Sequence, residues 1–126
     1  MDYNTEELWL PVVGYEGLYE VSSFGRVLSV ERTINRAGHA YRVRERILKA
    51  GPNKFGYPQV TLSKDGNKQP GQLVHWLVMQ AFTGPVPEGQ EVLHWDDNPS
   101  NNHLSNLRYG TRQENVDDKV RNKMGA

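Results

Sequence analysis

Short stretches of alternating hydrophobic and polar positions, separated by glycines, occupy the first third of the chain. The run LWLPVVGYEGLYEVSSFGRVLSVER has this character, and its glycines stand where turns are expected. The pattern predicts strands near residues 19–22, 26–30 and 41–48, with the segment TINRAGHA as a loop between the last two. Beyond the break GPNKFG, the segment YPQVTLSKDGNKQPGQLVH predicts a hairpin that turns at Asp65 and Gly66.

A helical period replaces the alternation at residues 73–82, LVHWLVMQAF, where apolar side chains recur three and four positions apart. This pattern predicts a mostly buried helix that ends before TGPVPEG. Farther along, EVLHW predicts a strand, DDNPSNNHLSN a loop and LRYGT a second strand. The segment TRQENVDDKVRNKM predicts a helix from Thr111, because Glu114 stands at the capping-box position three residues later. The C-terminal half is therefore predicted to run strand, loop, strand, helix.

Length and composition narrow the class of protein. A chain of 126 residues fits one domain, or a small module joined to another. The absence of cysteine excludes a disulfide framework and a thiolate metal site. No apolar run approaches the ~18 residues of a membrane span, and the start MDYNTEELWLP lacks the basic and apolar regions of a signal peptide. We therefore expect a soluble, cytoplasmic protein with no membrane partner.

The formal charge is zero overall but unevenly distributed. Residues 25–54 contain eight Lys or Arg against two acids, which gives this segment +6 and leaves −6 for the rest of the chain. Such segregation is typical of a surface that binds a polyanion. Arg42, Arg44 and Arg46 alternate along a predicted strand and would share one of its faces. The alternative, a solvated strand face of mixed charge, stays open.

The predicted strand, strand and helix would bring two distant polar residues together. His94 ends the first of these strands, and Asn115 lies in the first turn of the helix. A neutral imidazole can accept a proton from water, and an amide oxygen can bind a hard cation such as Mg²⁺. That combination suits phosphodiester hydrolysis. The residues alone also allow a structural histidine and a loop held by its asparagines, Asn98, Asn101, Asn102 and Asn106.

The segments LVHWLVMQAF and EGQEVLHWDDNPSNNHLSNLRYGTRQEN together resemble the HNH endonuclease family, in the branch found in phage and intron-borne homing endonucleases. The stretch GYEGLYEVSSFGRVLSV resembles the N-terminal module that often precedes HNH domains in those enzymes. The two matches cover roughly residues 9–30 and 72–121. The resemblance implies an α+β fold, with a β-rich DNA-binding module at residues 1–54 and a ββα-metal (HNH) nuclease domain at residues 55–126.

The resemblance also implies roles for individual residues. His94 matches the general base of the HNH signature, and Asn115 matches a metal ligand that is His or Asn among relatives. Asn106 matches the central Asn, which ties the hairpin loop and orients the base. His75 matches a histidine on the preceding helix, for which we expect structural support of the site.

The sequence departs from the family pattern at two positions. Leu93 stands immediately before the base, where many relatives have a metal-binding Asp or His, and Lys119 stands where some place another histidine. Asp96 and Asp118 are candidate replacement ligands, although capping the loop is the default role of Asp96. His103, in the loop, is a further candidate for support or ligation. Oxygen ligands favour Mg²⁺ or Mn²⁺ over zinc.

A DNA-binding surface is expected from the charge and the resemblance together. The predicted DNA contacts are Arg26, Arg42, Arg44, Arg46 and Arg108. Arg112, at the start of the last helix, is a candidate for stabilising the transition state, with a merely exposed arginine as the alternative.

Three functions follow from these features. The leading hypothesis is a metal-dependent DNA endonuclease, a nickase that acts as a monomer on double-stranded DNA and is encoded by a phage or mobile element. The second is a DNA-binding protein descended from such an enzyme, inactive because of Leu93 and Lys119. The third is a metal-free structural domain whose histidines belong to the core.

Overall fold

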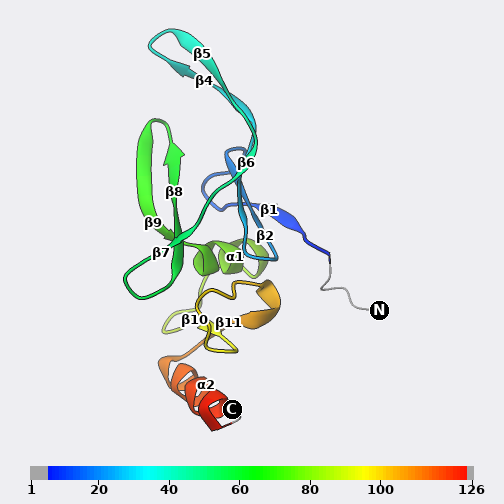
Figure 1. Ribbon diagram of the computed structural model, residues 1–126, viewed down its shortest axis with the longest axis vertical. Helices are drawn as coiled ribbons and strands as arrows, with labels where there is room; N and C mark the ends of the chain where they lie inside the picture. Colours follow the sequence, from blue (N-terminus) through cyan, green and yellow to red (C-terminus); the bar gives the residue numbers. More distant parts are fainter. Residues whose placement is uncertain (1–5, 125–126) are drawn as a thin grey trace.

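The computed structural model describes residues 6–124, which form an α+β fold of short antiparallel sheets and two α-helices (Figure 1). This is the fold class that the sequence predicted. Residues 1–5 and 125–126 lie outside the described residues, and with them the outer ends of the two predicted modules and part of the segment considered as a signal peptide. Neither helix in the described part is long and apolar enough to cross a membrane.

The N-terminal sheet contains four short strands in the spatial order β1-β2-β3-β6, each antiparallel to its neighbour. They are β1 (Trp9–Pro11), β2 (Tyr19–Ser22), β3 (Val27–Ser29) and β6 (Arg46–Ile47). Successive side chains of a strand point to opposite faces, and Tyr19, Val21 and Val27 are buried on the same side. The strands predicted near residues 19–22 and 26–30 are confirmed to within one residue at each end.

A hairpin of β4 (Arg32–Arg36) and β5 (His39–Val43) stands where the sequence predicted a loop and the start of a longer strand. Its two-residue turn is formed by Ala37 and Gly38, whose φ angles are 52° and 80°. Positive φ at both turn positions matches the twist of the flanking strands, so TINR can pair with HAYRV.

The prediction of one strand over residues 41–48 is wrong. The chain leaves the hairpin after β5 and pairs again only at β6, where Arg46 lies opposite Ser29 of β3. Arg42 and Arg46 therefore belong to two different sheets, and Arg44 lies between the strands. The three arginines do not share the face of one strand.

A second hairpin follows as predicted. β8 (Pro58–Lys64) and β9 (Asn67–Leu73) turn at Asp65 and Gly66, and β7 (Gly51–Pro52) pairs with the outer edge of β8. Helix α1 (Val74–Phe82) begins directly after β9, one residue later than predicted.

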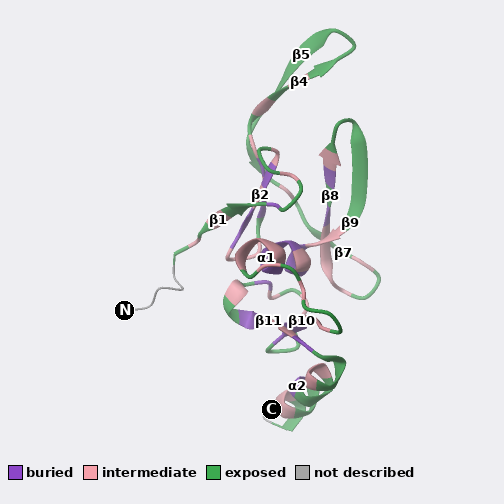
Figure 2. Ribbon diagram, turned by 180° about the vertical axis from the view of Figure 1, so that it is seen from behind, coloured by how far each residue is buried: buried purple, intermediate pink, exposed green. Residues whose placement is uncertain are grey.

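Helix α1 lies at the centre of the fold, against β2, β8 and the C-terminal hairpin (Figures 1 and 2). Its buried side chains join those of the N-terminal sheet and of β8 in one hydrophobic core. The core residues are Val12, Tyr19, Val21, Val27, Val60, Leu62, Val74, Leu77, Val78, Met79 and Leu107. Residues on both sides of position 54 thus share one core, and the division of the chain between residues 54 and 55 stays a prediction.

The C-terminal unit has the predicted order of strand, loop, strand and helix. It consists of β10 (Glu91–His94), a 3₁₀ turn η2 (Leu104–Asn106), β11 (Leu107–Gly110) and α2 (Arg112–Met124). The predicted capping box is present. The Glu114 amide donates to Thr111 Oγ1 at 3.2 Å, and the Thr111 amide donates to Glu114 Oε1 at 3.0 Å.

Candidate active site

A cavity of about 240 Å³ lies where the end of β10 meets the first turns of both helices. Its walls carry two histidines, two carboxylates and one amide. The lining residues are Tyr57, Leu73, His75, Trp76, Glu91, Val92, His94, Asp97, Pro99 and Asn115. The structure therefore brings together His94, Asn115 and His75, three residues that the sequence singled out from separate segments.

His94 is buried, and its Nε2 lies 2.8 Å from Oδ1 of Asn102. An amide oxygen can only accept a hydrogen bond, so Nε2 carries the proton in the neutral ring and Nδ1 keeps a free lone pair. Burial lowers the pKa of His94, and its hydrogen bond to Asn102 together with the negative charges of Asp96 and Asp97 offsets part of that effect. The ring is thus in its proton-accepting form at neutral pH.

Asn102 contacts the base, and sequence reasoning missed this role. It was grouped with the loop asparagines, yet its side chain is buried against His94. Gly25 makes this position possible. It has a φ of +88°, and a Cβ at that residue would stand 2.8 Å from both Cβ and the carbonyl oxygen of Asn102. The sequence marks Gly25 only as a turn, so no local signal separates Asn102 from its neighbours.

Asn106 closes the loop between β10 and β11 rather than contacting His94. Its Nδ2 donates to Asp96 Oδ1 and to the Asn101 carbonyl, both at 2.9 Å, and its Oδ1 accepts from the Asp96 amide at 3.2 Å. Asp96 also accepts from Asn101 Nδ2 at 2.8 Å and from the Asn98 amide at 2.9 Å. The carboxylate of Asp96 is occupied in the loop and does not line the cavity.

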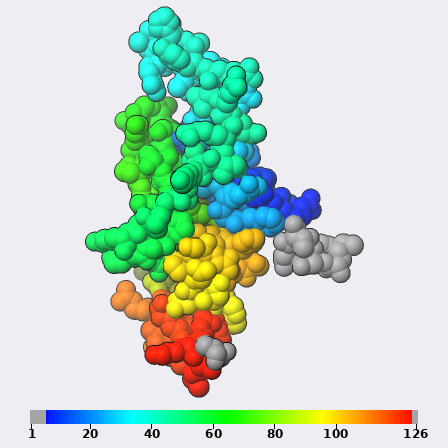
Figure 3. Space-filling view, in the orientation of Figure 1, coloured from blue at the N-terminus to red at the C-terminus, as the bar shows by residue number. Residues whose placement is uncertain are grey.

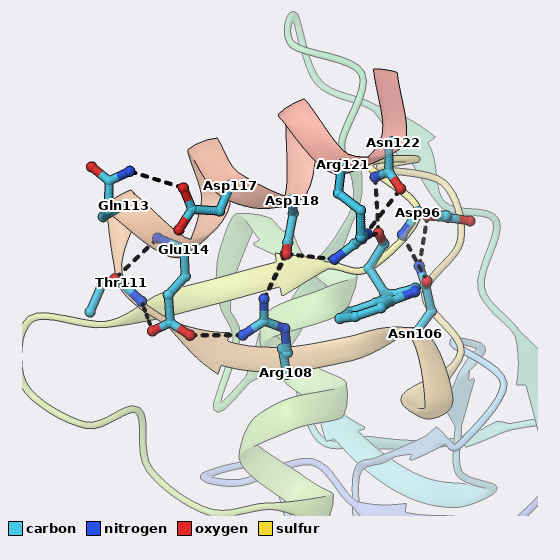
Figure 4. Close-up of polar contacts among 11 residues, drawn as sticks. Asp96, Asn106, Arg108, Thr111, Gln113, Glu114, Asp117, Asp118, Arg121 and Asn122 are labelled. Atoms are coloured by element: carbon cyan, nitrogen blue, oxygen red, sulfur yellow. Dashed lines mark hydrogen bonds and ion pairs between the residues drawn. The ribbon is translucent and has the colours of Figure 1, made fainter. Parts of the chain in front are cut away.

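Asp118, the other replacement ligand considered from the sequence, is buried in an ionic cluster (Figure 4). Its carboxylate accepts from Arg108 at 2.7 and 2.9 Å and from Arg121 at 2.8 Å. Arg108 also pairs with Glu114 at 2.9 Å. Both guanidinium groups lie over the ring of Trp95, that of Arg121 at 3.5 Å and that of Arg108 at 5.7 Å from the ring centroid. Asp118 and Arg108 therefore fasten α2 to the hairpin.

The remaining candidates lie at the edge of the cavity or away from it. His103 stacks on Phe24 at 4.8 Å between ring centroids and is absent from the cavity wall. Arg112 is exposed at the start of α2 and does not line the cavity. Lys119 binds Asp97 at 2.7 Å, which places a positive charge beside one cavity residue.

His75 lies beside His94 in the cavity. The two imidazole rings lie 5.1 Å apart between centroids, and Tyr57 lies 5.3 Å from His75 and 6.0 Å from His94. His75 is only 5% exposed, and its Nδ1 has no hydrogen-bond partner among residues 6–124. Burial, and then the neighbouring His94, lower the pKa of His75 from 6.5 to about 4.

The donors at the cavity fit a hard divalent cation better than zinc. Within the described part of the chain, no three His, Cys, Asp or Glu side chains are grouped as a metal-binding cluster. Leu93 is buried and absent from the cavity wall. Glu91 and Asn115 do offer oxygen ligands there, with Glu91 Oε1 3.4 Å from Asn115 Nδ2. Mg²⁺ is commonly held by one or two such groups while water and phosphate complete its shell.

The β4–β5 and β8–β9 hairpins project at the end of the molecule away from α2 (Figures 1 and 3). A cavity of about 1030 Å³ separates the hairpins. Its charged lining residues are Arg32, Arg36, Arg46, Lys64, Lys68 and a single acid, Asp65. Of the arginines predicted to bind DNA, Arg26 is paired with Glu7 and Arg42 with Glu31. Arg44 and Arg46 form no ion pair within residues 6–124.

Comparison with protein families gives the class to which this site belongs. A family model described as HNH endonuclease matches residues 72–117, and one described as NUMOD4 motif matches residues 7–63. The chain therefore contains an HNH endonuclease domain preceded by a NUMOD4 motif, as the resemblance implied. The HNH match includes His94, Asn106 and Asn115, and it contains every cavity residue except Tyr57, which lies in the NUMOD4 match.

The particular relatives are phage and prophage proteins. The chain is homologous to DNA endonuclease I-HmuI of Bacillus phage SP01, with 36% identity over 112 residues, 89% of this chain and 57% of that protein. The SPbeta prophage-derived putative HNH homing endonuclease YosQ of Bacillus subtilis (strain 168) is 37% identical over 61 residues, 48% of this chain and 35% of that protein. The chain thus spans 57% or less of the length of these curated relatives.

A solved structure supports the same relationship. It is described as DNA binding and cleavage by the HNH homing endonuclease I-HmuI, and it matches with a TM-score of 0.70 at 34% identity. The match covers 90% of this chain and 58% of that chain. The α+β fold predicted from the sequence is thereby confirmed.

Proposed function

We propose that this chain is a metal-dependent DNA endonuclease that hydrolyses a phosphodiester bond, with His94 as the general base and a divalent cation held in part by Asn115. The observation that carries the proposal is the meeting of His94 and Asn115 at one cavity, from strand β10 and helix α2. HNH nucleases generally use a divalent metal. The oxygen donors favour Mg²⁺ or Mn²⁺ as that ion.

The chain's own residues would activate and orient the attacking water. Nδ1 of His94 would take its proton, while Asn102 holds Nε2 and so fixes the tautomer and the ring. Asn106 would keep the loop closed behind the base through Asp96 and Asn101. A bound cation would polarise the phosphate and stabilise the departing oxygen. Arg112 would approach the phosphate only if its exposed side chain turned toward the cavity.

Double-stranded DNA is the proposed substrate, and the basic hairpins would bind its phosphates. Arg44 and Arg46, which form no ion pair within the described residues, are available to phosphates directly. Arg26 and Arg42 would have to exchange Glu7 and Glu31 for phosphate. Arg108 is held by two carboxylates, so its contribution would be to the position of α2. Such binding weakens steeply with added salt.

A single ββα site cuts one strand at a time, so we propose a nickase that acts as a monomer. The phage and prophage origin of the relatives supports a phage or mobile-element source and action in the cytoplasm of the host cell. A second candidate function, DNA binding without cleavage, is favoured by one observation. No cluster of three His, Cys, Asp or Glu ligands is found in residues 6–124, and Leu93 supplies none.

Cleavage of supercoiled plasmid tests the proposal. The native chain is expected to yield relaxed circles with Mg²⁺ or Mn²⁺ and none with EDTA. His94→Ala is expected to lower the rate by about 10²–10⁴-fold, the usual contribution of a general base. Asn115→Ala is expected to raise the metal concentration required, whereas the matched change Asn98→Ala, in the exposed loop, should not.

Two results would contradict the endonuclease. Cleavage that persists in His94→Ala would exclude His94 as the base. No cleavage by the native chain, together with a salt-sensitive gel shift on duplex DNA, would establish the binding function instead.

A further inference from the structure

Glu91, the first residue of β10, lines the same cavity as His94 and Asn115, and no role was expected for it from the sequence. It is half-buried, and the only hydrogen-bond partner of its carboxylate among the described residues is Nδ2 of Asn115, 3.4 Å from Oε1. That distance is long for a hydrogen bond to a carboxylate, which normally measures about 2.7–3.2 Å. The carboxylate is therefore poorly satisfied where it stands.

The second carboxylate of the cavity is differently placed. Asp97 is paired with Lys119 at 2.7 Å, so its charge is already balanced. Glu91 has no basic partner in residues 6–124. Withdrawing a carboxylate from water without a cation beside it is unfavourable, and the nearest group is a neutral amide. The cavity thus contains one carboxylate that lacks a positive partner.

His75 provides an independent sign that the cavity lacks a partner. His75 is only 5% exposed and lines the same cavity. Its Nδ1 has no hydrogen bond with any described residue. Buried polar atoms are nearly always paired, with protein, water or a bound group. An unpaired imidazole nitrogen and an unbalanced carboxylate, both from residues that line this cavity, indicate that the cavity is completed by something other than the chain.

We propose that Glu91 and Asn115 together form the cation site, with Glu91 supplying the carboxylate that Leu93 cannot. The inference rests on the proposed function, because it concerns the ion of that reaction. Residues two apart on a strand share a face, so Glu91 presents its carboxylate from the same face of β10 as Leu93. Turning the Asn115 amide about its last bond would aim Oδ1 at Glu91. Two oxygens on one Mg²⁺ at about 2.1 Å lie about 3 Å apart, close to the 3.4 Å observed.

Binding of Mn²⁺ to the full chain without DNA tests this site independently of cleavage. Free Mn²⁺ is measured by electron paramagnetic resonance, and the rise of the melting temperature with Mn²⁺ is followed in parallel. Glu91→Gln and Asn115→Ala are each expected to weaken binding by on the order of tenfold or more, because each removes one of two protein ligands. Glu88→Gln, the same substitution at an exposed position nearby, should bind as the native chain does.

A double variant separates ligation from a general loss of structure. In the double variant Glu91→Gln with Asn115→Asp, the carboxylate is supplied by position 115 and the amide by position 91. This variant is expected to recover most of the Mn²⁺ affinity. Native affinity in Glu91→Gln, or no Mn²⁺ binding by the native chain, would overturn the site. Metal- and His94-dependent plasmid cleavage would then still support the proposed function, whereas its absence would remove the function whatever Mn²⁺ does.

Discussion

The two helices that frame the cavity are held in place by opposite kinds of force. Helix α1 buries five of its nine residues, Val74, His75, Leu77, Val78 and Met79. Helix α2 buries one of thirteen, the charged Asp118. Apolar contact fixes α1 at the centre of the core, while α2 is fastened to the hairpin by ion pairs and a Trp95–arginine stack.

This difference bears on the site because each helix contributes one polar residue to it. His75 comes from α1 and Asn115 from α2, and both line the cavity of His94. Hydrophobic burial is insensitive to salt, whereas partly exposed ion pairs weaken as salt is added. The position of His75 should therefore be robust, and the position of Asn115 should respond to ionic conditions.

The largest change in stability is expected from a substitution in the buried face of α1. Leu77→Ala removes a buried side chain of α1 that is 5% exposed, so it should lower the free energy of unfolding by about 2–5 kcal/mol. Urea unfolding followed by circular dichroism measures the loss. Val116→Ala, on the exposed face of α2, should change stability by less than about 0.5 kcal/mol. Equal losses in the two variants would show that α2 is packed as α1 is.

A pH effect of similar size should come from His75. Its folded pKa of about 4 lies below 6.5, so the unfolded state takes up the proton first as pH falls. The contribution of His75 to the free energy of unfolding is therefore greatest above pH 6.5, declines between pH 6.5 and pH 4, and is constant below pH 4. This group should account for up to about 3 kcal/mol of that loss. The lowered pKa of His94 adds a loss of the same sign.

Urea unfolding between pH 7 and pH 4 checks this expectation against His75→Phe, which keeps a ring at the site and removes the titration. The variant should retain only the shallower slope due to His94. An unchanged slope would mean that His75 is charged in the folded state at acidic pH.

The close contact between Gly25, which follows strand β2, and Asn102 of the C-terminal loop can be disrupted by adding a side chain at Gly25. Gly25→Ala should lower the free energy of unfolding by about 2 kcal/mol, since a left-handed φ costs about 1–2 kcal/mol and the new Cβ meets Asn102. Gly17→Ala, with a φ of +80° and nothing within 4 Å of the added Cβ, carries the conformational cost alone. Plasmid cleavage should fall only in Gly25→Ala, because Asn102 can no longer hold His94.

How far the sequence predicted this molecule depends on whether a signal is local. The α1 period, the capping box at Thr111 and the turn at Asp65 and Gly66 are each contained in a few residues, and all three are observed. The β4–β5 turn was missed because alanine rarely adopts the positive φ that Ala37 has. Polar residues around it then suggested a loop.

Within the site, the meeting of His94 and Asn115 followed from the order of the elements and the family spacing. Asn102 could not be distinguished from Asn98 or Asn101 in the sequence. Its hydrogen bond to His94 depends on the close packing of Gly25, from a distant segment, against Asn102. Asp118 has the helical spacing to join Asn115, yet Arg108 on β11 takes its carboxylate. Side-chain pairing across elements is a property of the packed structure, and no local pattern encodes it.

The smallest expected effect, that of salt on the docking of α2, distinguishes the two helices most directly. Raising NaCl from about 0.05 M to about 0.5 M shortens the Debye length severalfold and should destabilise the docking of α2 by less than about 1 kcal/mol. Hydrogen exchange at the two salt concentrations should then speed up by a few-fold for α2 amides and stay constant for α1 amides. Asp118→Asn should exchange rapidly in α2 already at low salt and lose the salt response, because Arg108 and Arg121 no longer have their shared carboxylate. A salt response that persists in Asp118→Asn would assign the docking to Lys119 and Asp97 instead.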